Sequence, residues 1–265
     1  MTGMCTAIAH FGKDTIYGFN LDINEGAFLY DIYTSKDWFC IGCPADREMV
    51  LGSGETAWPP FYSVTDGIRK IHGVNRQGQF AACLNNMNFH KAPFRLSSDA
   101  CSIDQVMDDI ISGRRTIEEV RRFAEEIEIV TLPFGTVDVP DLGFHALCAD
   151  ASGHVLLLEP GNGYAVLREK NVALTNFAVL EPPADLTDAT VGYYGKNRYD
   201  TALRMLREHG DNLSPQDALG ILEDVCQRGN WATRISFAYS HNEKTVYYCR
   251  EGDFRKIIKH QFVET

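Results

Sequence analysis

The sequence contains no long hydrophobic run, since no apolar stretch among its 265 residues approaches the ~20 that a membrane-spanning helix needs. Its first residues also lack the basic segment and apolar core of a secretory signal. Glycine and proline, with 22 and 10 residues, occur at ordinary frequency, which excludes collagen-like and low-complexity classes. These absences predict a cytoplasmic globular protein with no membrane partner.

Clustered positive charge is also missing. The 25 Lys and Arg residues are outnumbered by 36 Asp and Glu, which gives a formal net charge of −11. Nucleic acids and anionic membranes are bound by clustered basic side chains, so neither is an expected partner. The densest basic group, formed by Arg114, Arg115, Arg121 and Arg122, alternates with Glu and predicts a solvated helix face.

The eight cysteines do not form a complete metal-binding pattern. In a chain of this length without a signal they favour reduced thiols over disulfides. Cys40 and Cys43 form one C-x-x-C pair, and no second pair completes a four-ligand zinc site. A turn at Pro44 follows where a redox-active pair would begin a helix. We therefore expect no metal and no cofactor, and two thiols near the end of a buried strand, with zinc binding as the alternative.

Glycine- and asparagine-containing turns divide the chain into short strands that favour antiparallel pairing. Strands are expected at 6–11, 15–22, 27–34, 68–73, 79–86, 144–150, 154–159, 164–168, 171–175, 233–240 and 245–250. Capping patterns, such as Thr116 three residues before Glu119 and Ser214 before Pro215, predict helices at 102–111, 116–127, 196–209 and 215–228. The apolar run 155–158 does not alternate and indicates a strand covered on both faces. The pattern favours one α+β domain, with an antiparallel sheet packed on a second sheet and on helices.

Cys5 follows Met4 near the start of the chain and becomes the first residue if the preceding ones are removed. A free α-amine titrates at about 7.7–8.0, close to a thiol at about 8.5. The amine can then take the thiol proton without help from a histidine. The thiolate would attack an amide carbonyl, form a thioester and be released by water. Alternatively, Cys5 is a small apolar residue at the start of a strand.

Five segments in order carry a family pattern: 4–8 (MCTAI), 17–22 (YGFNLD), 73–78 (GVNRQG) running to Leu84-Asn85, 173–176 (ALTN) and 197–199 (NRY). Together they resemble the choloylglycine hydrolase family of N-terminal-nucleophile (Ntn) hydrolases, which includes bile salt hydrolases, penicillin V acylases and the isopenicillin N acyltransferase branch. The resemblance runs from residue 4 to about residue 250. It implies a four-layer αββα sandwich with two antiparallel sheets. Residues 1–4 would be a propeptide removed by self-processing, unless translation starts at Met4, and residues 5–265 would form a single domain.

The resemblance also implies a role for each matching side chain. Cys5 would be the nucleophile, with its freed amine as the base, and Asp22 would hold that amine or thiol by a charge-assisted hydrogen bond. Asn85 would donate its amide to the oxyanion, and Asn176 would bind the amine or the substrate amide. Arg198 would place positive charge near the thiolate and lower the thiol pKa.

Each role has a structural alternative. Asn86 and Asn88 compete with Asn85, because the register of the segment 84–89 (LNNMNF) is ambiguous. Asp22 could cap a turn, the asparagines could lie in turns at strand ends, and Arg198 could occupy the surface of a helix. The histidines near strand ends, among them His145, receive no catalytic role, because this chemistry does not require an imidazole.

The sequence departs from the bile salt hydrolases at Phe19, where they carry Arg, and they are also longer. Both differences disfavour bile salts and favour the shorter acyltransferase-like branch. Phe19 and the Pro-containing loop with Trp58, Phe61 and Tyr62 are expected to line an apolar acyl pocket, together with residues 38–39. We therefore expect hydrolysis of a small linear N-acyl amide.

Two other functions are compatible with the same residues. An acyltransferase would pass the acyl group to an amine instead of water, and a catalytically silent binding protein could share the fold. A homo-oligomer, either a dimer or a tetramer, is compatible with the sequence as well.

Overall fold

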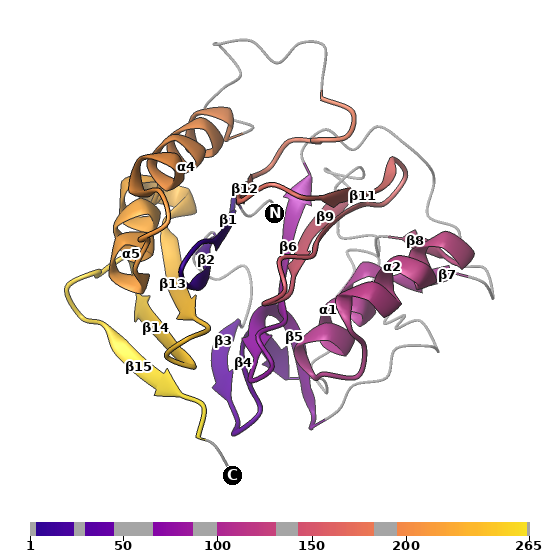
Figure 1. Cartoon of the computed structure of the whole chain (residues 1–265), viewed down its shortest axis with the longest axis horizontal. Helices are drawn as coiled ribbons and strands as arrows, with labels where there is room; N and C mark the ends of the chain where they lie inside the picture. The colour runs from indigo at the N-terminus through magenta and orange to yellow at the C-terminus, as the bar shows by residue number, and fades with distance from the viewer. Residues whose placement is uncertain are drawn as a thin grey trace.

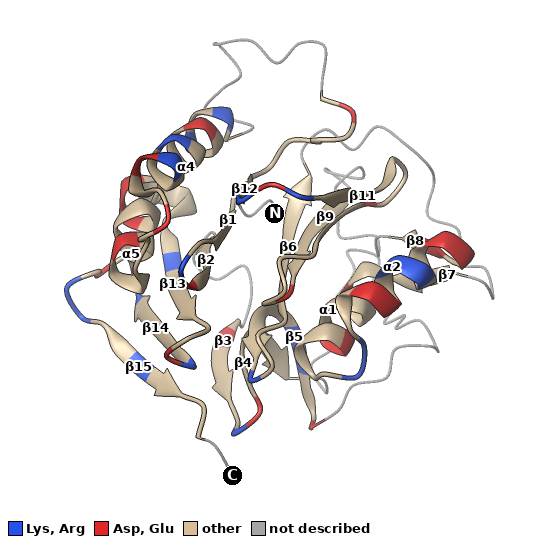
Figure 2. Ribbon diagram, viewed as in Figure 1, with Lys and Arg blue, Asp and Glu red and all other residues tan. Residues whose placement is uncertain are grey.

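The computed structural model describes residues 4–23, 30–44, 66–86, 100–130, 143–182 and 195–263. Two large antiparallel sheets pack face to face, and helices cover their outer faces (Figure 1). Charged residues gather on the outer helices and on the turns, while most strand positions carry uncharged side chains (Figure 2). The predicted α+β class and its helix–sheet–sheet–helix layering are confirmed.

The first sheet has six strands in the order β12-β1-β2-β13-β14-β15, and every neighbouring pair is antiparallel. Their bounds are β1 Thr6–Phe11, β2 Thr15–Asp22, β12 Asn171–Leu174, β13 Thr233–Ser240, β14 Thr245–Arg250 and β15 Ile258–Gln261. Because β1 lies between β2 and β12, the start of the chain is brought beside residues that follow 171 in the sequence.

The second sheet has seven antiparallel strands in the order β11-β10-β9-β6-β5-β4-β3. Their bounds are β3 Asp31–Thr34, β4 Trp38–Pro44, β5 Ile68–Asn75, β6 Phe80–Asn86, β9 Gly143–Ala149, β10 Val155–Glu159 and β11 Gly163–Leu167. A separate short parallel pair joins β7 Ala100–Ser102 to β8 Glu128–Val130. Cys40 and Cys43 both lie in β4. Cys43 is next to its last residue, as predicted for a thiol near a strand end, whereas Cys40 is the third of its seven residues.

Helices α1 Ile103–Ile111 and α2 Ile117–Glu126 cover the seven-stranded sheet, and α4 Lys196–His209 and α5 Pro215–Asp224 cover the six-stranded one. Capping boxes at Thr116 and Ser214 start α2 and α5 as predicted. The predicted helix 215–228 is too long, since α5 ends at Asp224. Beyond it the Gln227 N–H donates to the Thr233 hydroxyl and the Thr233 N–H donates to the Gln227 carbonyl, so Gln227 does not continue the helix. No helix in the described ranges is long and apolar enough to span a membrane.

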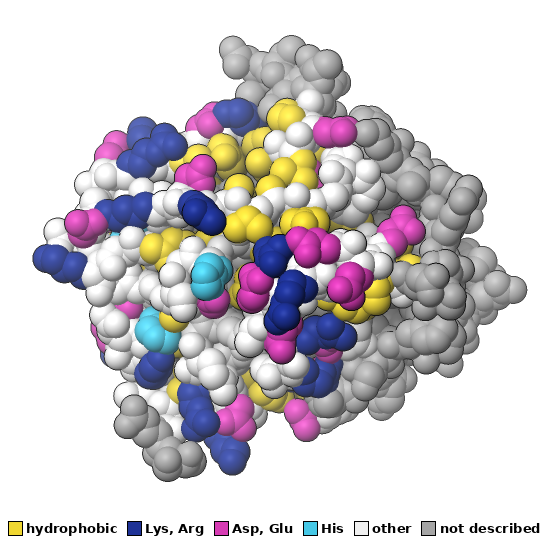
Figure 3. Space-filling model, turned by 45° about the vertical axis from the view of Figure 1, so that its right-hand side comes forward, with side chains coloured by type: hydrophobic (Ala, Val, Ile, Leu, Met, Phe, Trp, Pro, Cys, Tyr) yellow, Lys and Arg dark blue, Asp and Glu magenta, His cyan; other side chains and the backbone are white. Residues whose placement is uncertain are grey.

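The solvated basic face predicted between residues 114 and 122 is only half correct. Arg121 pairs with glutamates on the exposed face of α2. Arg114 and Arg115, however, lie in the connection between α1 and α2 and turn back to Asp109, which is buried. The turn after α1 brings these two guanidinium groups onto the carboxylate. On the face shown in Figure 3, basic and acidic side chains lie beside one another rather than forming a patch of one sign.

Strand alternation divides the apolar residues among the layers. On β2, Tyr17 and Phe19 point into the core between the sheets, where the Tyr17 ring stacks on Phe80 at 4.9 Å between centroids. The opposite face of the same strand packs on α5. Gly18 lies there, and a Cβ atom at this position would come within 2.9 Å of an Ile8 side-chain carbon. The run 155–158 is covered on both faces as predicted, because Leu157 faces the intersheet core and Leu156 faces the helix layer.

Candidate active site

Cys5 lies immediately before β1 and is almost fully buried. Its backbone N–H does not pair with a neighbouring strand but donates to the side-chain Oδ1 of Asn176, 2.9 Å away. The preceding residue, Met4, donates its own N–H to the backbone carbonyl of Asp22 at 2.8 Å. Cys5, the residue expected to become the first of the chain, is therefore held by the side chain of Asn176, which follows β12. The residue before Cys5 is held by the last residue of β2.

Arg198, near the start of α4, reaches the same point from the helix layer. One terminal nitrogen, Nη1, donates to the Cys5 carbonyl at 2.6 Å and to the Thr6 hydroxyl at 2.8 Å. The other, Nη2, donates to Asn176 Oδ1 at 2.8 Å. A Cβ atom on Gly195 would lie 2.3 Å from Nη2, so the glycine leaves room for the guanidinium. At 3% exposure, Arg198 is not a surface helix residue.

Asn176 connects three parts of the fold. Its Oδ1 accepts hydrogen bonds from Cys5 and Arg198, and its Nδ2 donates to the backbone carbonyl of Asn85 in β6 at 2.8 Å. Both groups that face Oδ1 are donors and the group that faces Nδ2 is an acceptor, so the network fixes the orientation of the amide. Asn176 thereby ties the chain start and α4 to the seven-stranded sheet.

Asp22, at the end of β2, is fully buried. Its Oδ1 accepts from the Thr233 hydroxyl at 2.6 Å, while Oδ2 lies 3.7 Å from Arg198 Nη1 and has no hydrogen bond within the described residues. Burial raises the pKa of Asp22 to about 7, and the charge of Arg198 and the Thr233 hydrogen bond oppose that rise. A carboxylate oxygen with spare acceptor capacity thus lies beside the same guanidinium nitrogen that binds the Cys5 carbonyl.

The Cys5 thiol is not activated while residue 4 remains attached. Burial, followed by the negative charge of Asp22, raises its pKa to about 12, against the lowering effects of the Asp22 backbone N–H and Arg198. No histidine in the described ranges is hydrogen-bonded to this thiol.

Solved structures of several hydrolases have a similar fold. A cysteine-to-alanine mutant of the conjugated bile acid hydrolase from Clostridium perfringens superposes with a TM-score of 0.63 at 17% identity, covering 97% of this chain and 92% of that chain. An arginine-to-leucine variant of the same enzyme gives 0.60 at 15% identity over the same shares. Penicillin V acylase from Agrobacterium tumefaciens gives 0.53 at 18% identity, covering 93% and 83%.

This chain has the fold of these hydrolases. No protein-family model and no curated protein matches the sequence significantly. The resemblance predicted from the five short segments is therefore confirmed at the level of the fold, which both kinds of hydrolase share with this chain.

Within this Ntn-type fold the expected oxyanion donor is only partly located. Asn85 reaches the site through its backbone carbonyl, which binds Asn176. Asn85 and Asn86 both lie in β6 and are buried, and Asn88 lies outside the described residues. Donation by the Asn85 side chain to an oxyanion stays a prediction.

Of the residues expected to line the acyl pocket, Phe19, Trp38 and Phe39 are described, and Trp58, Phe61 and Tyr62 lie outside the described residues. Phe39 lies in the intersheet core, but Trp38 packs in the cluster between the seven-stranded sheet and α1, so its predicted place in the pocket is wrong. Phe19 is fully buried in the intersheet core that also contains Cys5, and its ring stacks on His72 with 4.3 Å between centroids.

Sequence reasoning did not single out His72, because nothing in its local pattern marks it. Burial lowers the pKa of His72 to about 3, so the ring is neutral. Its Nδ1 accepts a hydrogen bond from the Cys83 backbone N–H at 3.2 Å, which leaves the hydrogen on Nε2.

The remaining cysteines are not organised as a metal centre in the described parts of the chain. All eight cysteines are free, and no group of three or more His, Cys, Asp or Glu side chains among the described residues could hold a metal ion. Cys40 is fully buried, and burial raises its pKa well above the usual range.

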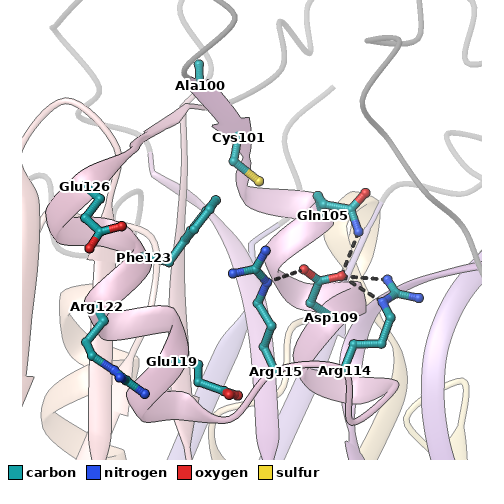
Figure 4. Close-up of a pocket in the computed structure, with 10 residues that line it drawn as sticks. All are labelled: Ala100, Cys101, Gln105, Asp109, Arg114, Arg115, Glu119, Arg122, Phe123 and Glu126. Atoms are coloured by element: carbon teal, nitrogen blue, oxygen red, sulfur yellow. Dashed lines mark hydrogen bonds and ion pairs between the residues drawn. The ribbon is translucent and has the colours of Figure 1, made fainter.

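A pocket of about 860 Å³ lies elsewhere, between α1 and α2 (Figure 4). Its lining consists of Ala100, Cys101, Gln105, Asp109, Arg114, Arg115, Glu119, Arg122, Phe123 and Glu126. None of the residues gathered around Cys5 belongs to it. Asp109 accepts hydrogen bonds from both Arg114 and Arg115, so these three charged groups of the lining pair with one another.

Proposed function

We propose that this protein is a cysteine amidohydrolase that cleaves linear N-acyl amides through a thioester on Cys5. The observation that carries the proposal is the hydrogen bond from the Cys5 backbone nitrogen to Asn176 Oδ1. At the start of a strand this N–H would ordinarily pair with a neighbouring strand. Here a buried side chain accepts it, and the same oxygen binds Arg198. This arrangement would hold a free α-amine beside its own thiol.

Removal of residues 1–4 converts the Cys5 nitrogen from a peptide amide, which cannot accept a proton, into an amine that can. Asn176 would keep one amine hydrogen bonded, so that the nitrogen lone pair is free to take the thiol proton. The buried cation of Arg198 would favour the thiolate. Asp22, with one oxygen unbonded among the described residues, would hold the protonated amine.

The chemical steps follow from this arrangement. The thiolate attacks the amide carbonyl, a tetrahedral oxyanion forms, and the Asn85 side chain would donate to it. The carbon–nitrogen bond then breaks, and the leaving amine takes the proton that the Cys5 amine had removed. Water, deprotonated by the same amine, attacks the thioester and releases the carboxylic acid together with the free thiol. Self-processing would use the same thiol on the Met4–Cys5 peptide bond.

The substrate class is a small amide with an apolar acyl group. The solved relatives are named as hydrolases of conjugated bile acids and as an acylase of penicillin V, and both of these compounds contain an acyl group joined to an amine. In this chain the intersheet space near Cys5 holds the uncharged rings of Phe19 and His72. An uncharged acyl group suits such walls better than one that needs a cationic partner.

The test measures amine release from penicillin V, a glycine-conjugated bile acid and a series of N-acyl amides with short apolar chains. Wild type should hydrolyse at least one of them, Cys5→Ala should hydrolyse none, and the buried-cysteine control Cys40→Ala should match wild type. Turnover by a folded Cys5→Ala protein would refute the proposal. Absence of wild-type turnover, together with alkylation of Cys5 no faster than that of Cys40, would instead identify a silent binding protein.

A further inference from the structure

A buried histidine and a buried glutamate lie between the two sheets at a distance from the proposed reacting atoms. His145 is in β9 and Glu159 ends the adjacent antiparallel strand β10. Alternation along these strands sends Leu147 and Leu157 into the intersheet core, and it sends His145 and Glu159 to the same side. Both side chains are completely buried, and His145 Nδ1 lies 3.4 Å from Glu159 Oε1. Two ionisable groups at this depth require specific partners.

Their partners lie in the segment that follows β12, in the opposite sheet. Glu159 accepts the backbone N–H of Val179 at 2.5 Å and that of Leu180 at 3.0 Å. His145 Nε2 lies 2.7 Å from the carbonyl oxygen of Thr175. Because β12 is an edge strand that ends at Leu174, these backbone groups fall beyond its ladder. His145 and Glu159 therefore make hydrogen bonds with backbone groups that lie beyond the strand pairing of the six-stranded sheet.

The hydrogen on His145 Nε2 can be assigned from its acceptor. The Thr175 carbonyl can only accept, so His145 Nε2 carries a hydrogen and donates it. Although burial opposes ionisation, the hydrogen bond and charge of His145 and the two backbone N–H groups keep the pKa of Glu159 below its usual range.

Asn176 lies inside the segment that this pair holds. Thr175 is fixed through its carbonyl by His145 and through its hydroxyl, which donates to the Gly195 carbonyl at 3.1 Å. Residues 179–180 are fixed by Glu159 on the far side of Asn176. Asn176, whose Oδ1 accepts the hydrogen bond from the Cys5 N–H, is thus flanked in sequence on both sides by residues that His145 and Glu159 hold through hydrogen bonds.

We propose that His145 and Glu159 are positioning residues that hold the 175–180 segment so that Asn176 Oδ1 meets the Cys5 nitrogen and Arg198. The proposal rests on the role of Asn176 beside Cys5 in the proposed function. It assigns no contact with substrate to either residue. They act through Asn176, so their effect should disappear once Asn176 is removed.

The experiment is a double-mutant cycle read out by alkylation of Cys5 with iodoacetamide, quantified by mass spectrometry, which requires no substrate. Asn176→Ala should slow alkylation about tenfold, because Arg198 loses an acceptor and its charge is held less firmly near the thiol. Glu159→Gln should slow it about fivefold in the wild-type background. In the Asn176→Ala background the same change should alter the rate by less than about twofold.

The matched control is Asp109→Asn, which converts a buried carboxylate with several hydrogen bonds in α1 into the same kind of amide. It should lower stability and leave the alkylation rate unchanged. Should Glu159→Gln fail to fold, His145 offers a second comparison. His145→Gln keeps a donor for the Thr175 carbonyl, and it should retain faster alkylation than His145→Leu.

Two results would overturn the proposal. One is additive effects of Glu159→Gln and Asn176→Ala, which would mean that the glutamate acts independently of the asparagine. The other is an Asn176→Ala protein alkylated at the wild-type rate. Amide hydrolysis that depends on Cys5, found together with additive alkylation effects, would reject the positioning role while leaving the proposed function intact.

Discussion

Cys5 and Cys40 make an instructive pair, because each is a buried thiol subject to the charges of a buried cation and a buried carboxylate. Arg198 and Asp22 act on Cys5 in the six-stranded sheet. Lys70 and Asp108 act on Cys40 in the seven-stranded sheet, and the Lys70–Asp108 ion pair is 3.3 Å long. In both cases burial is the largest influence and raises the thiol pKa.

The two sites differ in how completely their ionic groups are satisfied. Asp108 Oδ1 accepts hydrogen bonds from the side-chain ammonium and from the backbone N–H of Lys70. The other carboxylate oxygen of Asp108 pairs with Arg114. The Lys70 ammonium additionally lies 4.7 Å from the centre of the Trp38 ring. These contacts join β5 to α1 and leave the charges neutralised. Such a network is typical of a structural element between a sheet and a helix.

Around Cys5 the groups converge on the backbone of the cysteine instead. Arg198 binds its carbonyl, Asn176 binds its nitrogen, and Asp22 keeps an oxygen without a hydrogen bond among the described residues. A buried thiol beside an ion pair is therefore not evidence for catalysis by itself. The Cys5 site is distinguished by the polar side chains directed at the backbone of the cysteine and, under the proposed function, by processing that would free its nitrogen.

The largest expected difference between the two sites comes from replacing Asp22 and Asp108, each in its own variant, by asparagine. Asp22→Asn should lower turnover by about 10²–10⁴-fold, because the amide cannot hold the protonated amine as a carboxylate does. Assays of kcat/KM on the folded variant measure this loss. A variant with wild-type kcat/KM would show that Asp22 is only a turn residue.

Asp108→Asn should produce the opposite signature. It removes the buried anionic partner of Lys70, and breaking a buried ion pair costs about 3–5 kcal/mol. Urea unfolding should show this loss of free energy, while kcat/KM of the remaining folded protein should equal that of wild type. A fall in kcat/KM without loss of stability would remove the distinction between the two sites.

Arg198→Lys should lower kcat/KM by about 10²-fold, because an ammonium cannot reproduce the planar fork that binds Cys5, Thr6 and Asn176 together. The matched change Arg114→Lys, in a partly exposed guanidinium on the other side of the molecule, should leave kcat/KM unchanged. Equal effects of the two substitutions would indicate a general loss of packing.

The raised pKa of Asp22 should make the stability of the protein depend on pH. The Asp22 pKa of about 7 lies above the unfolded value, so folding loses stability as pH rises through the interval between them. In a Cys5→Ala background, which cannot self-process, stability attributable to Asp22 should fall by about 2–3 kcal/mol between pH 5 and pH 8. Urea titrations of this protein and of its Asp22→Asn derivative measure the difference, and parallel pH profiles would contradict the expectation.

The smallest expected effects come from the helix caps. Thr116→Ala at the start of α2 and Ser214→Ala at the start of α5 should each cost about 1 kcal/mol of unfolding free energy. Neither change should alter the alkylation rate of Cys5. An altered rate in Ser214→Ala alone would show that the position of α5 is coupled to the site.

Local sequence patterns were sufficient for most of the elements. Turn glycines separated the paired strands, and the cap residues Thr116 and Ser214 located the starts of two helices. The short strands β7, β8 and β15 were not predicted, because three or four residues carry too little periodicity.

The site required more than local pattern. The Cys5–Asn176 contact joins residues 171 positions apart, and the family resemblance, rather than composition or periodicity, brought them together. His145 and Glu159 could not be found in this way, because their partners are backbone groups of the segment that follows β12. No side-chain pattern in the sequence marks an N–H group that lacks a strand partner.

The central claim is that the Cys5 amine is the base, and the most direct measurement is the intact mass of protein that is shown to hydrolyse an amide. We predict that the active protein lacks Met1, Thr2, Gly3 and Met4. We also predict that a form which retains them does not turn over. Full activity in a preparation whose mass includes all four residues would contradict the account.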